Sequence, residues 1–598
     1  MKYLLVILMS FSSVIMASAQ MNADKPYTDW VNPFIGTGAH GHTFPGATTP
    51  FGMVQLSPDT RLTGWDGCSG YHYTDNEIYG FSHTHLSGTG VSDYGDILLM
   101  PFTGDVKWNN GADGKPGYKN TFSKDSERAS PGCYQVHLDE SDVTVRLTAS
   151  PRGGVHHYKF DDKNLTKGVL LDLAHRDEVL SSGIRVVDEY TIEGHRHSSS
   201  WADDQRLYFK VRFSHPIMKY KINAGNEFPM SNEVEGKNIK SAFYFNPSIT
   251  ELTIKVSISA VDIDGARNNF IVELKDYNFS SIKKQAEDLW NHELGKIDAE
   301  FHTEDQKTIF YTALYHTMIA PNLYTDADGR YRAMNKDIMT ADDHTHYTVF
   351  SLWDTYRSTH PLYTIIDQKR TNDFIKTMLA KHESGGILPI WDLSACYTGC
   401  MIGYHGVSAI SDAYVKGIRG YDAELALEAM VHSATQRHLG LDAYQDQGFI
   451  SVDQEAESVS KTLEYAYDDF CIAQMASAMN ESALTKQFRR RALNYKNVFN
   501  RETGFFRGKI FNYWQSHFDP FEVNSNYTEA NAWHYGFSVP HDIEGLIDLH
   551  NGSEGLDKKL DLLFSVESDV SGKNLKDITG LIGQYAHGNE PSHHIPFL

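Results

Sequence analysis

Hydrophobic and polar residues alternate with a period of two through residues 130–275. Three stretches show it most clearly, with polar residues between apolar ones that are two positions apart: Val143, Val145, Leu147, Leu207, Phe209, Val211, Phe213, Leu252, Ile254, Val256 and Ile258. Such alternation is typical of strands with one face in a core and the other in water, as in antiparallel sheets. Several such strands separated by loops predict an antiparallel β-sandwich.

The second half of the chain changes to the longer period of helices. Thr303 and Gln306 have the spacing of a capping box, and Asp422 precedes another helical pattern. The faces predicted to point inward in these two helices are Phe310, Ala313, Leu314 and Met318, then Leu425, Ala426, Ala429 and Met430. Further helices are predicted over residues 461–479 and 482–498. Successive helices joined by polar loops favour an all-α domain of paired helices.

The chain therefore divides into four predicted segments. Residues 1–19 read as a signal peptide, with Lys2, an apolar run and a small-residue cleavage site ending at Ala19, so the protein is expected to be secreted or periplasmic. Residues 26–278 form the β-sandwich, 279–299 a linker helix, and 300–598 the helical domain. After the signal peptide, no stretch is apolar enough to suggest membrane insertion.

Composition narrows the classes of partner. The chain has 77 acidic against 54 basic residues, a formal charge of −23. This charge repels phosphate backbones and anionic lipids, so nucleic acid is not expected as a partner. An aromatic content of 12% fits a sugar-binding protein and equally a β-rich core. The five cysteines are an odd number, and the pair Cys396 and Cys400 has no second pair with which to form a zinc site.

Glu529 is the first candidate for chemistry. It lies in the stretch Thr-Glu-Ala-Asn-Ala-Trp, four residues before Trp533. An apolar neighbour raises the pKa of a carboxyl group by disfavouring its charged form, which suits a general acid near neutral pH. On general grounds alone, a surface carboxylate or a helix start is the commoner role for such a residue.

A second candidate lies near the end of the sequence, where His587, Asn589 and Glu590 precede two further histidines. The spacing lacks the i, i+4 pair of H-E-x-x-H, which disfavours zinc. Oxygen donors from Asn589 and Glu590 suit calcium better. A purely structural loop is the competing interpretation.

Trp353, Asp354 and Arg357 form a third group. An Asp–Arg pair three residues apart on a helix is often a stabilising ion pair, or it can clamp a sugar hydroxyl, because Asp accepts and Arg donates with fixed geometry. Trp65 lies in the long, glycine- and histidine-rich stretch 31–96, where it either lines a pocket or packs between elements.

At these stretches the sequence resembles glycoside hydrolase family 92 along nearly its whole mature length. The segments that carry the resemblance include NPFIGTGAHGHTFPGATTPFGMVQLSPD, GWDGCSGYHY, FSHTHLSGTG, FSLWDTYRSTHPL, CMIGYHG, SVSKTLEYAYDDFCIAQMA, YTEANAWHYGFSVPHD and HGNEPSHHIPFL. The resemblance implies an N-terminal β-sandwich followed by a C-terminal (α/α)6 barrel. It also implies calcium-assisted, exo-acting hydrolysis of terminal α-mannosyl linkages of glycans, with inversion.

Residue by residue, the resemblance makes Glu529 the general acid. Glu590 and Asn589 become the expected calcium ligands, and Asp354 an expected mannose contact. The other expected substrate contacts are Arg357, Trp353, Trp65 and His587. Members that prefer α-1,2 bonds tend to carry Glu where this chain has Gly588, which favours α-1,3 or broader specificity here.

The sequence departs from the family pattern at its end. In the family, the base aspartate lies well after the Asn-Glu-Pro stretch, whereas this sequence ends at Leu598. We therefore expect an incomplete barrel without the general base, and little activity from these residues alone. Two alternatives remain open: a non-catalytic, calcium-dependent carbohydrate-binding protein, and another (α/α)6 glycosidase acting on glucosides.

Overall fold

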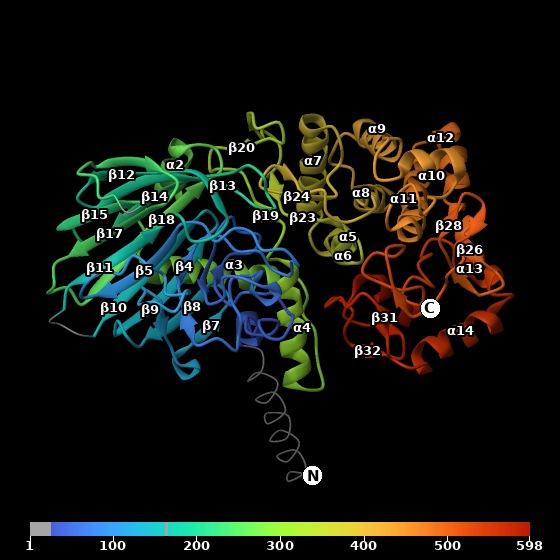
Figure 1. Cartoon of the computed structure of the whole chain (residues 1–598). Helices are drawn as coiled ribbons and strands as arrows, with labels where there is room; N and C mark the ends of the chain where they lie inside the picture. The colour runs from blue at the N-terminus through green and yellow to red at the C-terminus, as the bar shows by residue number, and fades with distance from the viewer. Residues whose placement is uncertain (1–24, 162–164, 226) are drawn as a thin grey trace, which may run out of the picture. The chain divides into compact units, whose positions relative to one another are not determined.

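The computed structural model describes residues 25–161, 165–225 and 227–598. The predicted signal peptide lies outside these residues. The chain forms two compact units that divide between Asp328 and Gly329, an antiparallel β unit followed by a mainly helical unit (Figure 1). This order confirms the expected fold class, while the predicted boundaries at 278/279 and 299/300 stay predictions. No helix in the described part is long and apolar enough to cross a membrane.

Two antiparallel sheets build the first unit. The seven-stranded sheet has the order β1-β2-β4-β5-β11-β17-β15, and the nine-stranded sheet the order β16-β12-β13-β14-β18-β10-β9-β8-β7. The bounds in the first sheet are β1 Ala47–Thr48, β2 Gln55–Asp59, β4 Gly80–Ser82, β5 Leu98–Thr103, β11 Lys167–Asp172, β15 Lys219–Ala224 and β17 Ile239–Phe245. Those in the second are β7 Arg128–Ser130, β8 Cys133–Leu138, β9 Val143–Ser150, β10 Gly153–Phe160, β12 Glu178–Asp188, β13 Thr191–Ser199, β14 Gln205–Phe213, β16 Glu233–Gly236 and β18 Glu251–Ser259.

The core of this unit confirms the period-two prediction. The alternating apolar residues of β9, β14 and β18 are all buried, and those of β5, β11 and β17 join them in one hydrophobic cluster. Both sheets thus contribute one face to a shared core, and polar side chains occupy most of the alternate positions. The stabilisation comes from apolar area removed from water, so the alternation fixes which face of each strand is buried.

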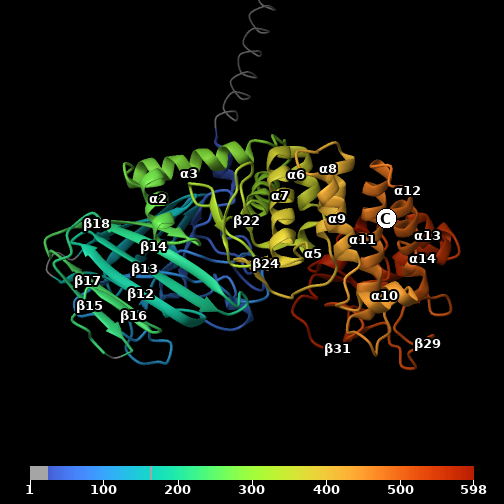
Figure 2. The ribbon, with the colours of Figure 1, turned by 90° about the horizontal axis from the view of Figure 1, so that it is seen from above.

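Three helices complete the first unit: α2 Ile263–Glu273, α3 Phe279–Leu294 and α4 Glu304–Thr317. Figure 2 shows α3 running along the β unit. Trp290 of α3 is buried, donates its indole N–H to the Thr48 carbonyl at 2.7 Å, and lies 4.4 Å from the Tyr315 ring centre. The helix predicted to link the domains is therefore packed into the β unit.

The helix α4 begins as predicted, because the Thr303 hydroxyl accepts the Gln306 N–H at 3.2 Å. Its predicted inward face is wrong at one position, since Ala313 is exposed. Tyr311 and Tyr315 are buried instead. These two rings are four residues apart and define the buried face, because they remove far more area from water than an alanine does.

The second unit contains most of the helices: α5 Leu352–Thr355, α6 Thr359–Ile366, α7 Gln368–Gly385, α8 Gly406–Val415, α9 Ala423–Ala434, α10 Leu441–Gln447, α11 Ser458–Ala478, α12 Ser482–Arg491, α13 Ile543–Leu549 and α14 Ser553–Ser565. Asp422 caps α9 as predicted, accepting the N–H groups of Glu424 and Leu425 at 3.0 Å. In α9 the apolar residue buried in place of Leu425 is Leu427. All five cysteines of the chain are free thiols.

Candidate active site

Glu529 lies in the irregular segment between β30 (Glu522–Val523) and α13. Its φ is +48°, in the left-handed region that non-glycine residues rarely adopt. The side chain is half-buried. Burial, together with the nearby carboxyl groups of Asp577 and Glu590, raises the pKa of Glu529 to about 8. The group therefore keeps its proton near neutral pH, as a proton donor must.

The sequence predicts that the indole of Trp533 raises the pKa of Glu529. In the structure this indole lies edge-on to Phe505 at 4.8 Å between ring centres, and the Lys559 ammonium group lies 4.2 Å over it. The charged groups that raise the pKa of Glu529 are carboxylates. The direction of the expected shift thus agrees with the structure, while its cause is burial and like charge.

Asn589 and Glu590 lie beside Glu529, although about sixty residues separate them in the sequence. The Asn589 side-chain N–H donates to the Glu529 carbonyl at 3.0 Å, and Asn589 is buried. Glu590 begins the short helix η5 (Glu590–Ser592). Burial raises the pKa of Glu590 and Asp577 raises it further, whereas the Arg357 charge opposes the shift.

Asp354 joins this group from α5. Its carboxylate accepts the Ser351 hydroxyl. Burial raises the pKa of Asp354 well above its usual range, and Glu590 and Glu529 contribute to the rise. The structure thus brings together Asp354, Glu529 and Glu590, and it adds Asp577, which the sequence did not single out. These carboxyl groups disfavour one another's ionisation, which adds to the effect of burial on the pKa values of Asp354, Glu529 and Glu590.

These residues fit calcium by their chemistry. Their donors are oxygens, which calcium prefers, and burial, with a smaller contribution from Asp577, raises the pKa of Glu590, so a divalent cation there would favour its charged form. Among the described residues, one group of three His or acidic side chains has its donor atoms within 4.8 Å of one another. It consists of His137, Asp142 and Asp161 in the β unit and does not include Glu590. Calcium at Glu590 would therefore depend on amide and main-chain oxygens in addition to carboxylates.

A buried carboxylate on α11, that of Glu464, takes part in four hydrogen bonds. Oε1 of Glu464, on α11, accepts the indole N–H of Trp353 at 3.1 Å and a guanidinium N–H of Arg357 at 3.0 Å. It also accepts the Tyr535 hydroxyl at 3.0 Å. The other oxygen contacts His405 Nε2 at 2.6 Å. Burial alone would raise the pKa of Glu464, but the Arg357 charge and the contacts with His405 and Trp353 lower it to about 2.

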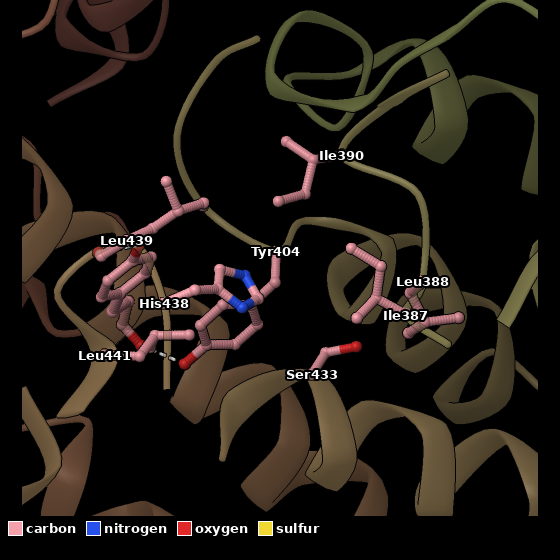
Figure 3. A pocket seen from close by; sticks show the side chains of 10 residues that line it. Ile387, Leu388, Ile390, Tyr404, Ser433, His438, Leu439 and Leu441 are labelled. Atoms are coloured by element: carbon pink, nitrogen blue, oxygen red, sulfur yellow. Dashed lines mark hydrogen bonds between the residues drawn. The ribbon is translucent and has the colours of Figure 1, made fainter. Parts of the chain in front are cut away.

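His405 connects Glu464 to a further buried acid. Its Nδ1 lies 2.7 Å from Asp468, one turn further along α11, and the Tyr356 ring stacks on the imidazole at 4.1 Å. The two carboxylates outweigh burial and raise the pKa of His405 to about 9. Figure 3 shows a cavity beside the neighbouring Tyr404. It leaves about 10 Å³ for the centre of a water-sized sphere, about the minimum for one water and too small for a sugar.

Comparison with known proteins decides the family. Residues 30–259 match the N-terminal domain of glycosyl hydrolase family 92, and residues 265–598 match its catalytic domain. The chain belongs to glycoside hydrolase family 92. The catalytic-domain match alone covers more than half of the sequence, and the expected α-mannosidase family is thereby confirmed.

Solved structures agree with this family 92 assignment. A GH92 α-mannosidase from Bacteroides thetaiotaomicron, in complex with mannoimidazole, is 37% identical, with a TM-score of 0.92 over 96% of this chain and 78% of that one. A GH92 inverting mannosidase from the same organism is 30% identical, with a TM-score of 0.86 over 96% and 80%. An uncharacterized secreted glycosidase of Arthroderma benhamiae is 25% identical over 89% of this chain and 73% of its own length.

The remaining predicted substrate contacts of this family 92 α-mannosidase each contact another residue of their own unit. His587 is exposed and its Nδ1 lies 3.0 Å from the Tyr585 hydroxyl. Trp65 belongs to the β unit, where it is half-buried with its ring centre 5.0 Å from that of His42. Trp353 is buried, and Arg357 also donates to the Trp353 carbonyl at 3.0 Å. Their roles as substrate contacts stay predictions.

Proposed function

We propose that this family 92 α-mannosidase removes terminal α-mannosyl residues from glycans with inversion, and that Glu529 is its general acid. The observation that carries the proposal is a half-buried carboxyl group with a pKa of about 8, next to Asn589 and Glu590. A neutral carboxyl group can give its proton to the glycosidic oxygen as the bond breaks. The raised pKa of Glu529 leaves a substantial protonated fraction at neutral pH.

An inverting hydrolase also needs a second carboxylate, about 6.5–9.5 Å from the acid, to activate water. We assign no residue of this sequence to that role. The expectation that these 598 residues alone turn over little substrate stays a prediction. It is tested by assaying the purified chain on an aryl α-mannoside with calcium, and substantial turnover would contradict it.

Asn589 and Glu590 are the proposed calcium ligands. A calcium ion held by these residues would supply positive charge that orients the hydroxyl groups of a bound mannose. Asp354 is the proposed contact to a mannose hydroxyl, because the charges of Glu529 and Glu590 both act on its carboxyl group and raise its pKa. Arg357, fixed by Glu464, keeps positive charge beside these acids.

Export and glycan specificity belong to the same proposal. The Arthroderma benhamiae relative is a secreted glycosidase, which supports export of this protein. Mannose-containing glycans are the proposed partners. Gly588 leaves no side chain at a position where a carboxylate could contact the leaving sugar, which supports α-1,3 or broader linkage preference over strict α-1,2 preference.

The proposal is tested by Glu529→Gln in the complete gene product, which keeps the shape of the side chain and removes its proton. We expect a loss of about 10²–10⁴-fold in kcat for an α-linked mannobiose. An aryl mannoside with an acidic phenol should lose less, because its leaving group needs little protonation. The stereochemistry of the first-formed mannose, read by NMR, tests inversion.

The matched control is Glu522→Gln, seven residues earlier in β30, where the carboxylate accepts the Asn524 side-chain N–H at 3.0 Å and lies 3.6 Å from His517 Nε2. It should change kcat little. Wild-type turnover of mannobiose by the Glu529→Gln protein would refute the assignment of the general acid.

A further inference from the structure

A short hairpin in the helical unit exposes a group of aromatic side chains. It consists of β28 (Lys509–Ile510) and β29 (Tyr513–Trp514), and it projects from the unit in Figure 2. The exposed fractions are 67% for Phe511, 79% for Tyr513 and 36% for Trp514. Large apolar side chains gathered on one surface feature often mark a binding site.

The backbone holds this aromatic tip in an uncommon conformation. Phe511 is the first of the two loop residues and has φ +52°, where hairpins usually place asparagine, aspartate or glycine. Its N–H donates to the Ser451 hydroxyl at 3.0 Å. A bulky residue keeps such a conformation only where its surroundings hold it, and positions of this kind are common at ligand sites.

Basic side chains flank the tryptophan. The Lys509 ammonium group lies 4.8 Å from the Trp514 ring centre, and the Arg507 guanidinium 5.9 Å from it. These cations fix the indole by cation–π attraction. Lys509 Nζ donates to the Asn497 carbonyl and Arg507 Nη2 to the Gln515 carbonyl, both at 2.9 Å. Each group has further N–H bonds that can donate to hydroxyl groups, so the surface combines flat apolar rings with hydrogen-bond donors, as a neutral sugar requires.

The base of the hairpin is joined to the segment that carries Glu529. The Asn526 side-chain N–H donates to the Gln515 side-chain oxygen at 2.7 Å, and the Tyr527 hydroxyl donates to the Phe506 carbonyl at 2.7 Å. Asn526 precedes Glu529 by three residues, a chain length of at most about 11 Å. The aromatic tip is four residues from Gln515, which is at most about 14 Å along the chain. Together with the hydrogen-bonded side chains between them, these lengths place the tip at most about 35 Å from the acid, a distance that several sugar units can span.

We propose that Phe511, Tyr513 and Trp514 bind the part of a mannose glycan that continues beyond the terminal, cleaved residue. Pyranose C–H faces pack on the aromatic rings, and the flanking cations contact hydroxyl groups. The choice of mannose rests on the proposed function, whereas the binding surface itself does not. An exo-acting enzyme holds one sugar at the acid, so a longer substrate must lie over the surface that surrounds it.

Binding is tested without catalysis, by electrophoresis of the complete gene product in gels containing soluble α-mannan. Tyr513→Ala combined with Trp514→Ala should weaken retardation about tenfold or more, the usual effect of removing central aromatic anchors. Tyr513→Phe keeps the ring and should preserve retardation. Tyr277→Ala, an exposed tyrosine of the β unit, is the matched control. Near-wild-type melting temperatures show that the variants are folded.

Kinetics provide the second readout. In the double variant, the ratio of kcat/KM on a long oligomannoside to kcat/KM on an aryl mannoside should fall about tenfold. Unchanged retardation and an unchanged ratio would overturn the proposal. Equal, hairpin-dependent retardation in a β-glucan gel would overturn the specificity for mannose glycans. If mannan retardation depends on the hairpin while no α-mannoside is hydrolysed, this proposal stands and the proposed function fails.

Discussion

At the scale of single residues, Glu464 connects the pieces of the candidate site. Two of its four hydrogen-bond partners are Trp353 on α5 and Arg357 just after that helix. The other two are His405, directly before α8, and Tyr535, in the segment that carries Glu529. None of these contacts is local in sequence. Glu464 could have been noticed, since Glu464 and Asp468 are four residues apart on a helix that is otherwise largely apolar. Sequence alone gives no partner for either acid, because the partners come from distant segments.

Replacement of Glu464 by Gln should strongly destabilise the fold. The change keeps the volume but leaves the Arg357 charge buried without its carboxylate, which costs about 3–5 kcal/mol in the free energy of unfolding. Urea denaturation measures this loss. Asp288→Asn removes the acid of an exposed pair with Lys284 and should cost less than about 1 kcal/mol. Equal effects of the two substitutions would contradict the role assigned to Glu464.

His405 should make stability depend on pH in the alkaline range. Its pKa is raised from 6.5 to about 9 in the folded protein, so its stabilising charge is fully present below pH 6.5 and is lost as the pH rises through 9. We expect the free energy of unfolding to fall by about 3 kcal/mol over this interval. Urea denaturation at several pH values tests this. His405→Gln should flatten the dependence, and an unchanged slope would rule out His405 as its source.

At the scale of elements, the hydrophobic pattern predicts secondary structure correctly where an element buries one face and exposes the other. The strands β9, β14 and β18 and the caps at Thr303 and Asp422 all follow from local spacing. The inward face of α4 could not be predicted fully, because Ala313 and Tyr315 both fit a helical pattern and only the packed neighbours decide between them. The neighbour of Tyr315 is Trp290, which lies on a different helix.

Trp290→Ala should show how firmly α3 is joined to the β unit. The substitution removes a buried indole, its hydrogen bond to Thr48 and its contact with Tyr315. We expect a loss of about 3–5 kcal/mol in the free energy of unfolding. Leu289→Ala, at the exposed neighbouring position, should cost much less. A small effect of Trp290→Ala in urea denaturation would mean that α3 is held by other contacts.

At the scale of the whole molecule, the candidate site gathers residues from positions 354, 464, 529 and 590. The family resemblance pointed to Asp354, Glu529 and Glu590, while Asp577, His405 and Glu464 needed the fold. Long-range convergence of this kind depends on how helices and loops pack, which no local period records. The cause of the Glu529 shift is the clearest case, because its charged neighbours are distant in sequence.

Calcium should stabilise the complete gene product by mass action if Glu590 and Asn589 bind it. At a concentration 100 times its Kd, the gain is about 2.7 kcal/mol, read as a higher melting temperature that a chelator reverses. Glu590→Gln should reduce this shift. Asp161→Asn alters the other group of potential ligands, His137, Asp142 and Asp161, and should not. The opposite result would place calcium on the β unit.

The five free thiols have a consequence for how the molecule is made. Three of them, Cys68, Cys396 and Cys471, are buried, and none of the five takes part in a disulfide in the described residues. We therefore expect these residues to fold without an oxidant or a disulfide isomerase, in a reducing cytoplasm as in an oxidising compartment. Dithiothreitol should accordingly leave the thermal transition where it is.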